Sequence, residues 1–241
     1  MSEAFPSSTP YMADRVCMQI SFIIPTLNEE TIVGATLQTL QSPRERGHEV
    51  IIADGGSKDG TLVACTGLVN HVVPSERGRA RQMNAGAAVA LGDVLVFLHA
   101  DTQLPADADS RVLAVLACAG CVWGRFDIRL AGRNPVYRLI EFMMNLRSRV
   151  SGIASGDQAI FVRRSIFQTI GGYPDIPLME DIAICRALKR FARPYCLRVR
   201  AVTSCRRWEQ RGILRTMILM WCLRLAYALG VSARRLAGFY N

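Results

Sequence analysis

No stretch of this sequence is apolar for long enough to cross a bilayer. A spanning helix takes about 18 or more consecutive apolar residues, and Arg215 and Arg224 interrupt the most apolar stretch, residues 212–229. Residues 1–17 lack the apolar core of a secretory signal, so we expect them to form a flexible extension. The sequence therefore predicts neither a membrane-spanning helix nor a cleaved leader.

Histidine is scarce, with three residues in the chain, and the eight cysteines do not form a metal-binding pattern. Only Cys118 and Cys121 make a C-x-x-C pair, and no second pair or histidine cluster completes a zinc site. Most cysteines have apolar neighbours in the sequence, which predicts buried, reduced thiols. We therefore expect a protein of a reducing compartment, the cytoplasm.

Acidic residues are almost missing from the last third of the chain. Residues 186–235 hold thirteen basic residues and one acid, Glu209, so this segment carries +12 in a chain whose net charge is +9. Such a segment is typical of proteins that meet a polyanion, although a solvated basic surface is the alternative. We expect a diphosphate or an anionic membrane as the partner, and no nucleic acid.

Short apolar runs alternate with helical patterns in the first half of the chain. The expected strands are residues 20–25, 50–54, 71–73 and 94–99, and the expected helices between them are 31–41, 60–68 and 78–91. Further strands at 122–130 and 158–162 and helices at 135–148, 180–191 and 212–229 are expected later. This order predicts an α/β fold with a doubly wound, mostly parallel, Rossmann-like sheet.

Polar loops follow three of the expected strands. They are residues 25–30 (PTLNEE), 54–60 (DGGSKDG) and 99–102 (HADT). Ligands bind at the carboxyl ends of strands in such sheets, so three polar loops at one edge favour a site. Any single loop is also explained by turn formation and helix capping.

Residues 21–30 (SFIIPTLNEE), 52–61 (IADGGSKDGT) and 97–102 (FLHADT), taken in order, closely resemble the family 2 glycosyltransferases. The resemblance implies the GT-A fold and an inverting transfer of a sugar from a nucleoside diphosphate sugar to a hydroxyl, without a covalent intermediate. We expect a GT-A domain at 18–210 and a C-terminal helical appendage, apolar and amphipathic, at 211–241.

The resemblance also implies which residues contact the nucleotide. Thr26 and Glu29 follow the first strand, and Asp54 resembles the family aspartate at the uracil and ribose, so we expect a UDP-sugar donor. A carboxylate there can accept hydrogen bonds from base N–H groups or ribose hydroxyls. Arg79 and Arg81 are two residues apart on a helix and cannot face one way. We take Arg81 as the nucleotide contact.

Asp101 resembles the last aspartate of the family's Asp-x-Asp signature, which implies that it holds Mg²⁺ or Mn²⁺ against the donor diphosphate. His99 stands where the first aspartate of that signature is expected. An imidazole ligand would favour Mn²⁺. The alternative is that His99 is a neutral supporting group or a strand-end residue.

Glu180 and Asp181 resemble the family's Glu-Asp pair, which implies that Asp181 is the general base for the acceptor hydroxyl. A metal-bound diphosphate leaves readily, so no general acid is needed. Both acids also suit a helix N-terminus, whose dipole should keep Asp181 anionic. Glu180 and Asp157 are further candidates for acceptor or diphosphate contacts.

Residues 206–208 (RRW) loosely resemble a motif of processive relatives. Arg207 would lie near the diphosphate and Trp208 would stack on a sugar, or Trp208 is a core residue of a basic loop. The arginines in and after residues 212–229 suit a helix lying on the anionic inner face of the cell membrane. A lipid-linked or cell-envelope glycan acceptor would fit that placement.

Two other functions stay open from the sequence. A nucleotidyltransferase normally carries a Gly-rich loop with a basic residue near its N-terminus, and residues 25–30 are acidic instead. A catalytically degenerate protein that only binds nucleotide sugars would explain the missing first aspartate. The presence of Asp54, Asp101 and Asp181 argues against it.

Overall fold

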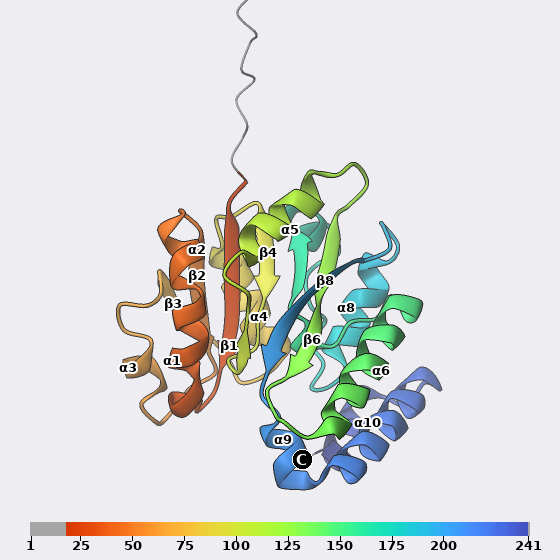
Figure 1. The fold of residues 1–241 in the computed structure, drawn as a ribbon. Helices are drawn as coiled ribbons and strands as arrows, with labels where there is room; N and C mark the ends of the chain where they lie inside the picture. Colours follow the sequence, from red (N-terminus) through yellow and green to blue (C-terminus); the bar gives the residue numbers. More distant parts are fainter. Residues whose placement is uncertain (1–17, 241) are drawn as a thin grey trace, which may run out of the picture.

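A curved eight-stranded sheet runs through the protein (Figure 1). The computed structural model describes residues 18–240, apart from the side chains of Arg207 and Arg211. In their order across the sheet the strands are β3(His71–Pro74), β2(Glu49–Asp54), β1(Ile20–Thr26), β4(Val94–Phe97), β7(Ile160–Arg163), β6(Trp123–Leu130), β8(Tyr195–Thr203) and β5(Thr102–Gln103). The expected α/β fold with a mostly parallel sheet is confirmed.

The first four strands are parallel. β1 pairs with β2 and β4, and β2 pairs with β3. All six residues of β2 and all four of β4 are buried, which explains why their apolar runs show no alternation. In register, Thr26 lies opposite Asp54, so the polar loops after β1 and β2 start side by side.

The second part of the sheet is mixed. β7 lies antiparallel between β4 and β6, while β8 runs parallel to β6 with a register shift between Phe126 and Asp127. β5 pairs antiparallel with the end of β8, where Thr102 lies opposite Thr203. The segment that follows the predicted metal residue is therefore held by a strand about a hundred residues later.

Helices cover both faces of the sheet. On one face, α1(Glu30–Thr39) and α5(Ala108–Ala117) bury Leu37 and Val112 in one apolar core. On the other, α4(Arg79–Val89), α7(Arg164–Thr169) and α8(Glu180–Leu188) bury Met83, Phe167 and Ile184. The remaining elements are α2(Gln41–Glu45), α3(Thr61–Ala64), α6(Pro135–Ser151), the 3₁₀ turn η1(Gly156–Gln158), α9(Arg206–Arg211), α10(Ile213–Ala228) and α11(Ala233–Tyr240).

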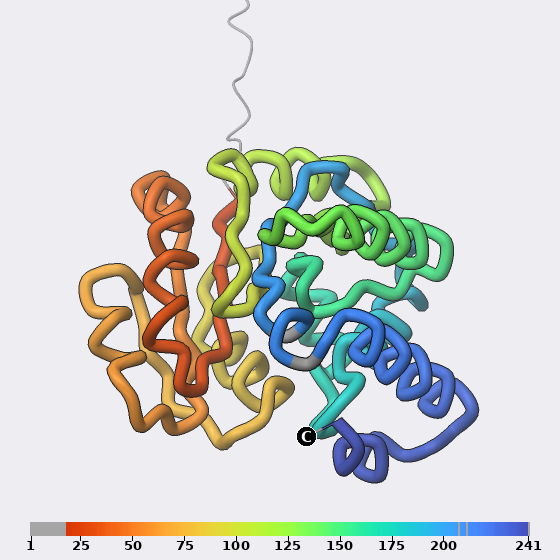
Figure 2. The backbone as a smooth tube through the Cα atoms, turned by 60° about the horizontal axis from the view of Figure 1, so that its bottom comes forward, coloured from red at the N-terminus to blue at the C-terminus, as the bar shows by residue number. Residues whose placement is uncertain are grey.

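The C-terminal helices pack beside the start of α8 (Figure 2). Leu223 of α10 and Leu236 of α11 form one cluster with Leu178, Met179 and Ile182. Within residues 18–240, no helix combines the length and apolarity that a membrane crossing requires.

The cysteines differ from the expectation. Cys65, Cys185 and Cys205 are buried, but Cys118 and Cys222 are exposed, so the expectation that most are buried is wrong. An apolar sequence context did not imply burial, because α10, which carries Cys222, leaves one side of its apolar residues exposed. The described cysteines are free thiols, as expected; Cys17 lies outside the described residues.

Candidate functional site

The loops after β1 and β2 are tied together at the carboxyl edge of the sheet. The Asn28 N–H donates to Ser57 Oγ at 2.9 Å, and the Lys58 N–H donates to Asn28 Oδ1 at 2.8 Å. Asn28 adopts a left-handed conformation with φ 55°, which Asn tolerates better than most residues. The Glu29 N–H donates to Thr61 Oγ1 at 2.8 Å. The two loops therefore form one rigid unit.

Asp54 organises this unit. Its carboxylate is buried and accepts hydrogen bonds from Thr26 Oγ1 at 3.1 Å, Gly56 N–H at 3.0 Å and Ser57 N–H at 2.8 Å. The structure thus brings the predicted nucleotide residues Thr26 and Asp54 into contact. It also shows the turn-forming role of Asp54, so its contact with the nucleotide stays a prediction.

Gln82 of α4 ties the same strand ends together and was missed by the sequence analysis. Its buried Nε2 donates to Thr26 O at 2.7 Å and to Ala53 O at 2.9 Å. Thr26 O also accepts from the Gly55 N–H at 2.9 Å, and an unpaired buried carbonyl would be costly. A polar residue on the buried face of an expected helix was the available signal.

The two arginines at the start of α4 point apart, as their spacing requires. The Arg81 guanidinium pairs with Asp175 at 2.8 and 2.9 Å and with Glu76, and it is partly exposed. Arg79 Nη1 lies 3.9 Å from Glu180 Oε1. Desolvation by burial lowers the pKa of Arg79, but nearby negative charges, Glu180 first, outweigh it, so the pKa is raised. Arg79 is thus the arginine that faces the acids of α8, and a nucleotide contact for Arg81 stays a prediction.

A small pocket opens where the carboxyl end of β4 meets the amino end of the antiparallel strand β7. Its lining residues are Met83, Phe97, His99, Gly156, Ile160, Tyr173, Glu180 and Asp181. The predicted base and its neighbouring acid therefore share one hollow with the residue that replaces the first aspartate of the signature. Apolar walls around a few convergent polar groups are typical of small-molecule sites.

His99 is held by the turn η1. Its Nδ1 lies 3.0 Å from Asp157 Oδ1, and its Nε2 lies 2.3 Å from where a Cβ on Gly156 would be. Only glycine therefore fits at position 156 with the ring in this place. Both ring nitrogens face η1, so the geometry favours a supporting role for His99 over metal ligation.

Asp101 is held by its backbone at the end of the same strand region. The Thr102 N–H donates to His99 O at 3.1 Å, and the Ser204 N–H donates to Asp101 O at 3.2 Å. Among residues 18–240, no three His, Cys, Asp or Glu side chains gather as a ready metal site. A metal that is bound mainly by substrate phosphates needs only one or two carboxylates from the protein, and Asp101 can supply one.

Glu180 and Asp181 follow a left-handed residue, Met179, with φ 68°. The Ile182 N–H donates to Asp181 Oδ1 at 2.7 Å, and Glu180 is buried. Burial raises the pKa of Asp181 to about 6, and the charge of Glu180 adds to the rise. Burial therefore opposes the helix dipole that was expected to keep Asp181 anionic, and a carboxylate with this pKa suits a general base near neutral pH.

The turn η1 is braced from α6. Gln158 is fully buried, and its Nε2 donates to Ser148 Oγ at 3.0 Å, while its Oε1 accepts from the Ser155 N–H at 3.1 Å. Arg147 of α6 also approaches this region, and its charge lowers the pKa of Asp181, although burial and Glu180 outweigh it. The sequence analysis missed both Gln158 and Arg147, since nothing in the spacing shows that α6 faces η1.

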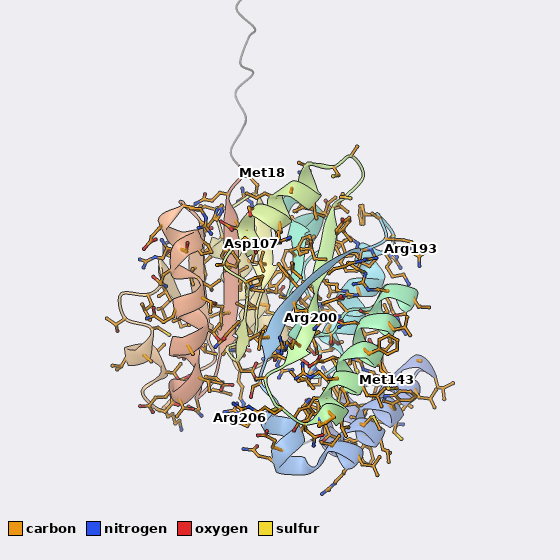
Figure 3. All side chains as sticks on the ribbon, viewed as in Figure 1. Met18, Asp107, Met143, Arg193, Arg200 and Arg206 are labelled. Carbon is orange, nitrogen blue, oxygen red and sulfur yellow. The ribbon has the colours of Figure 1, made fainter. Side chains whose placement is uncertain are left out.

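The predicted motif at residues 206–208 lies in α9. Trp208 is half-buried and packs with Tyr137, Ile140 and Ile213, which supports the core alternative; stacking on a sugar stays a prediction. The side chain of Arg207 lies outside the described residues. Its neighbour Arg206, at the lower edge of the sheet in Figure 3, pairs with Glu29 through Nη2 and Oε2 at 3.3 Å.

Sequence comparisons identify the family of this chain. The profile of the family described as "Glycosyl transferase family 2" matches residues 21–192. A PGL/p-HBAD biosynthesis glycosyltransferase of Mycobacterium bovis (strain BCG / Pasteur 1173P2) is 31% identical over 169 residues, which cover 64% of this chain and 62% of the relative. The chain thus spans less than two thirds of that relative's length.

Solved structures show the same fold. S. aureus TarS 1-349 in complex with UDP-GlcNAc superposes with a TM-score of 0.64 at 19% identity, covering 78% of this chain and 58% of that one. Mannosyltransferase PcManGT from Pyrobaculum calidifontis, in complex with GDP-Man and Mn2+, gives 0.62 at 21% identity, covering 87% and 61%. Both are glycosyltransferases of the GT-A fold, which this chain shares.

Proposed function

Because this chain belongs to glycosyl transferase family 2, we propose that it moves a sugar from a nucleoside diphosphate sugar to a hydroxyl acceptor with inversion. The proposal rests mainly on the position and the pKa of Asp181. Asp181 lines the pocket at the carboxyl edge, and burial raises its pKa to about 6, so it is mostly ionised at neutral pH and able to take a proton.

The donor would bind along the carboxyl ends of β1, β2 and β4. The unit of Thr26, Asp54 and Gln82 offers a preformed floor for the nucleoside, and the loop glycines Gly55 and Gly56 let the ligand approach the backbone. The UDP-GlcNAc complex of TarS supports a uridine donor, and the GDP-Man complex of PcManGT makes guanosine the second candidate.

Asp101 would hold a divalent metal, Mg²⁺ or Mn²⁺. The metal would neutralise the diphosphate as it leaves. Asp101 forms no ion pair with any residue in the described part of the chain, so its carboxylate is open to a cation. The Mn2+ in the PcManGT complex supports this cofactor.

The chemical step needs one proton acceptor. The acceptor oxygen bonds to the anomeric carbon while the bond from that carbon to the diphosphate oxygen breaks, and Asp181 takes the hydroxyl proton. Glu180, paired with Arg79, and Asp157, held by His99, would position the acceptor. Attack opposite the leaving group inverts the anomeric carbon.

The acceptor class follows from charge and placement. We propose a lipid-linked or cell-envelope glycan acceptor, met by a protein bound peripherally to the inner face of the membrane. The +12 charge of residues 186–235 supports this assignment, as does the apolar surface of α10.

A calorimetric titration with UDP- and GDP-sugars, with and without Mn²⁺, tests the donor. UDP-sugars should bind more tightly with Mn²⁺ than without it, and Asp101→Ala should abolish that difference. Product analysis by NMR should show the inverted anomer. A retained anomer would reject the one-step mechanism, and binding without transfer or hydrolysis would favour the binding-only alternative.

A nucleotidyltransferase is the remaining alternative, and the same titration separates it. That enzyme would bind nucleoside triphosphates productively and release pyrophosphate. Release of a nucleoside diphosphate from the sugar donor, with no pyrophosphate, is expected instead.

A further inference from the structure

The exposed face of α6 is apolar along its whole length. The exposed residues of this helix, every residue of which the structure describes, are Pro135, Val136, Leu139, Phe142, Leu146 and Val150. Its acid Glu141 is buried, and Arg138 and Arg149 turn back to pair with Glu141 and Asp127. A surface helix in water normally shows the reverse pattern.

α10 repeats this pattern. Its exposed residues, in a helix described throughout, are Leu214, Arg215, Ile218, Trp221, Cys222, Leu225 and Ala228. Arg215 is the one charged residue among them. Phe142 on α6 and Trp221 on α10 each leave about two thirds of their surface to solvent, at 63% and 62%. Large aromatic side chains are rarely left in water without a partner.

The two helices lie on the same side of the molecule, away from α1 and α3 (Figures 1 and 2). Tyr137 and Met144 of α6 share one apolar cluster with Ile213 of α10. Met143 of α6 is labelled in Figure 3 where this helix runs near α10. We call the exposed apolar residues of α6 and α10 the apolar face.

The charge around the apolar face selects its partner. Arg215 lies at the start of α10, and α11 adds the exposed Arg234 and Arg235. A second copy of the chain would bring the same excess of positive charge, which opposes pairing through this face. An anionic lipid surface complements both the apolar stripe and its basic border.

We propose that α6 and α10 together dock the protein on an anionic phospholipid bilayer, with Phe142 and Trp221 entering its interface. The inference rests on the proposed membrane association and extends it from the C-terminal segment to a helix of the catalytic domain. α10 packs its inner residue Leu223 against Met179 and Ile182. The segment around the predicted base therefore packs directly against the inner sides of α10 and α11, through Leu223 and Leu236.

Vesicle sedimentation tests the role of each helix. The vesicles are phosphatidylcholine alone and phosphatidylcholine mixed with phosphatidylglycerol, and the wild type should bind only the mixed ones. Phe142→Glu and Trp221→Glu should each lower the partition coefficient about tenfold or more, because each removes a large apolar side chain from the interface. Val63→Glu is the matched control, since Val63 is 78% exposed on α3, on the far side.

The chain carries its own footprinting control. Cys222 is exposed on α10, and Cys118 is exposed at the end of α5, away from the apolar face. Mixed vesicles should protect Cys222 from a polar maleimide and leave Cys118 reactive. Circular dichroism melting of each variant confirms that the fold is kept.

Each outcome is decisive. Equal binding by wild type and Phe142→Glu would overturn the role of α6 and leave membrane association through α10 intact. Failure of the wild type to bind the mixed vesicles would overturn the membrane roles of both α6 and α10. A dimer in sedimentation equilibrium that Phe142→Glu dissociates would identify a second copy as the occupant. Transfer to a water-soluble acceptor, expected to be unchanged in Phe142→Glu, tests the proposed chemistry separately.

Discussion

Asp181 is the side chain on which turnover should depend most. Asp181→Asn keeps the shape and removes the basicity, so kcat should fall by a factor on the order of 10²–10⁴ with donor affinity kept. In the wild type kcat should fall as the pH drops through about 6, where Asp181 takes up a proton. Steady-state kinetics across pH measures both effects.

Glu180 provides the control for Asp181. Glu180→Gln should retain far more turnover, because Glu180 pairs with Arg79. The reverse ranking of the two variants would move the base to Glu180. Full activity in both would remove the pair from the mechanism and make Asp157 the next candidate.

Ionised Asp181 should lower the free energy of unfolding. In an unfolded chain the pKa of Asp is near 3.9, whereas burial raises the folded value at Asp181 to about 6. The folded state therefore loses stability as the pH rises between these values, and the loss is complete above them. Asp181→Asn cannot ionise, so it should raise the free energy of unfolding by about 1–3 kcal/mol at neutral pH. Urea unfolding at neutral pH and near pH 4 measures this, and an equal gain at both would contradict it.

His99 should matter for the acceptor and not for the metal. His99→Ala removes the contact with Asp157 and frees η1, so KM for the acceptor should rise about tenfold, the worth of a hydrogen bond to a charged group. His99→Asn keeps a donor near the Nδ1 position and should restore most of the loss. Calorimetry should show unchanged Mn²⁺ dependence of donor binding; a weaker metal response would make His99 a ligand.

Sequence reasoning located the acids of the site better than their partners. Asp54 ends β2, Asp101 lies in the loop after β4 and Asp181 is at the start of α8, where linear order alone indicates one edge of the sheet. Arg79 and Gln82 lie within α4, and their roles depend on which face of that helix meets the sheet. The raised pKa of Asp181 depends on burial, which only the packed structure shows.

At the level of elements, the four parallel strands in the first half of the chain were predicted closely, and a later strand was not. The expected strand at 20–25 is Ile20–Thr26, and that at 71–73 is His71–Pro74. Tyr195–Thr203 was missed, because its arginines alternate with apolar residues and mask a strand that is only partly buried. The expected helix at 60–68 is shortened to Thr61–Ala64, since turns follow it.

The attachment of α4 to the strand ends gives a test at this scale. Gln82→Leu keeps the size of the side chain and removes the Nε2 donor from the carbonyls of Thr26 and Ala53, although Thr26 O keeps the Gly55 N–H. The free energy of unfolding should fall by about 1–3 kcal/mol, the cost of unpaired buried polar groups. Chemical denaturation measures it. Gln38→Leu, at an exposed position of α1, is the matched control and should change little.

For the whole molecule, the family and the α/β fold were predictable because three motifs occur in a fixed order along the chain. The mixed half of the sheet was not, since pairing of β5 with β8 joins residues that no local pattern connects. The placement of the C-terminal helices also had to come from the structure. Their arginines indicated a partner, but not that α10 braces the segment before the base.

That bracing predicts a long-range effect on turnover. Leu223 is 4% exposed and packs against Leu178, Met179 and Ile182. Leu223→Ala should destabilise the protein by about 2–5 kcal/mol and lower kcat while leaving the dissociation constant of the nucleoside diphosphate nearly unchanged. Leu225→Ala, on the exposed side of the same helix, is the control for kinetics in solution. Parallel losses in kcat and donor affinity would show a general loosening instead.

The pairing of β5 with β8 also bears on how the chain acquires its activity during synthesis. β1 to β4 join through short connections and can assemble as the N-terminal part emerges. In contrast, the carbonyl of Asp101 accepts a hydrogen bond from the Ser204 N–H, and Thr102 pairs with Thr203 across β5 and β8. Contacts this distant in sequence form late, because the loop they close is long. During synthesis, the proposed nucleoside site at Thr26 and Asp54 should therefore form well before the proposed metal site at Asp101. Transfer cannot begin until β8 has been synthesised.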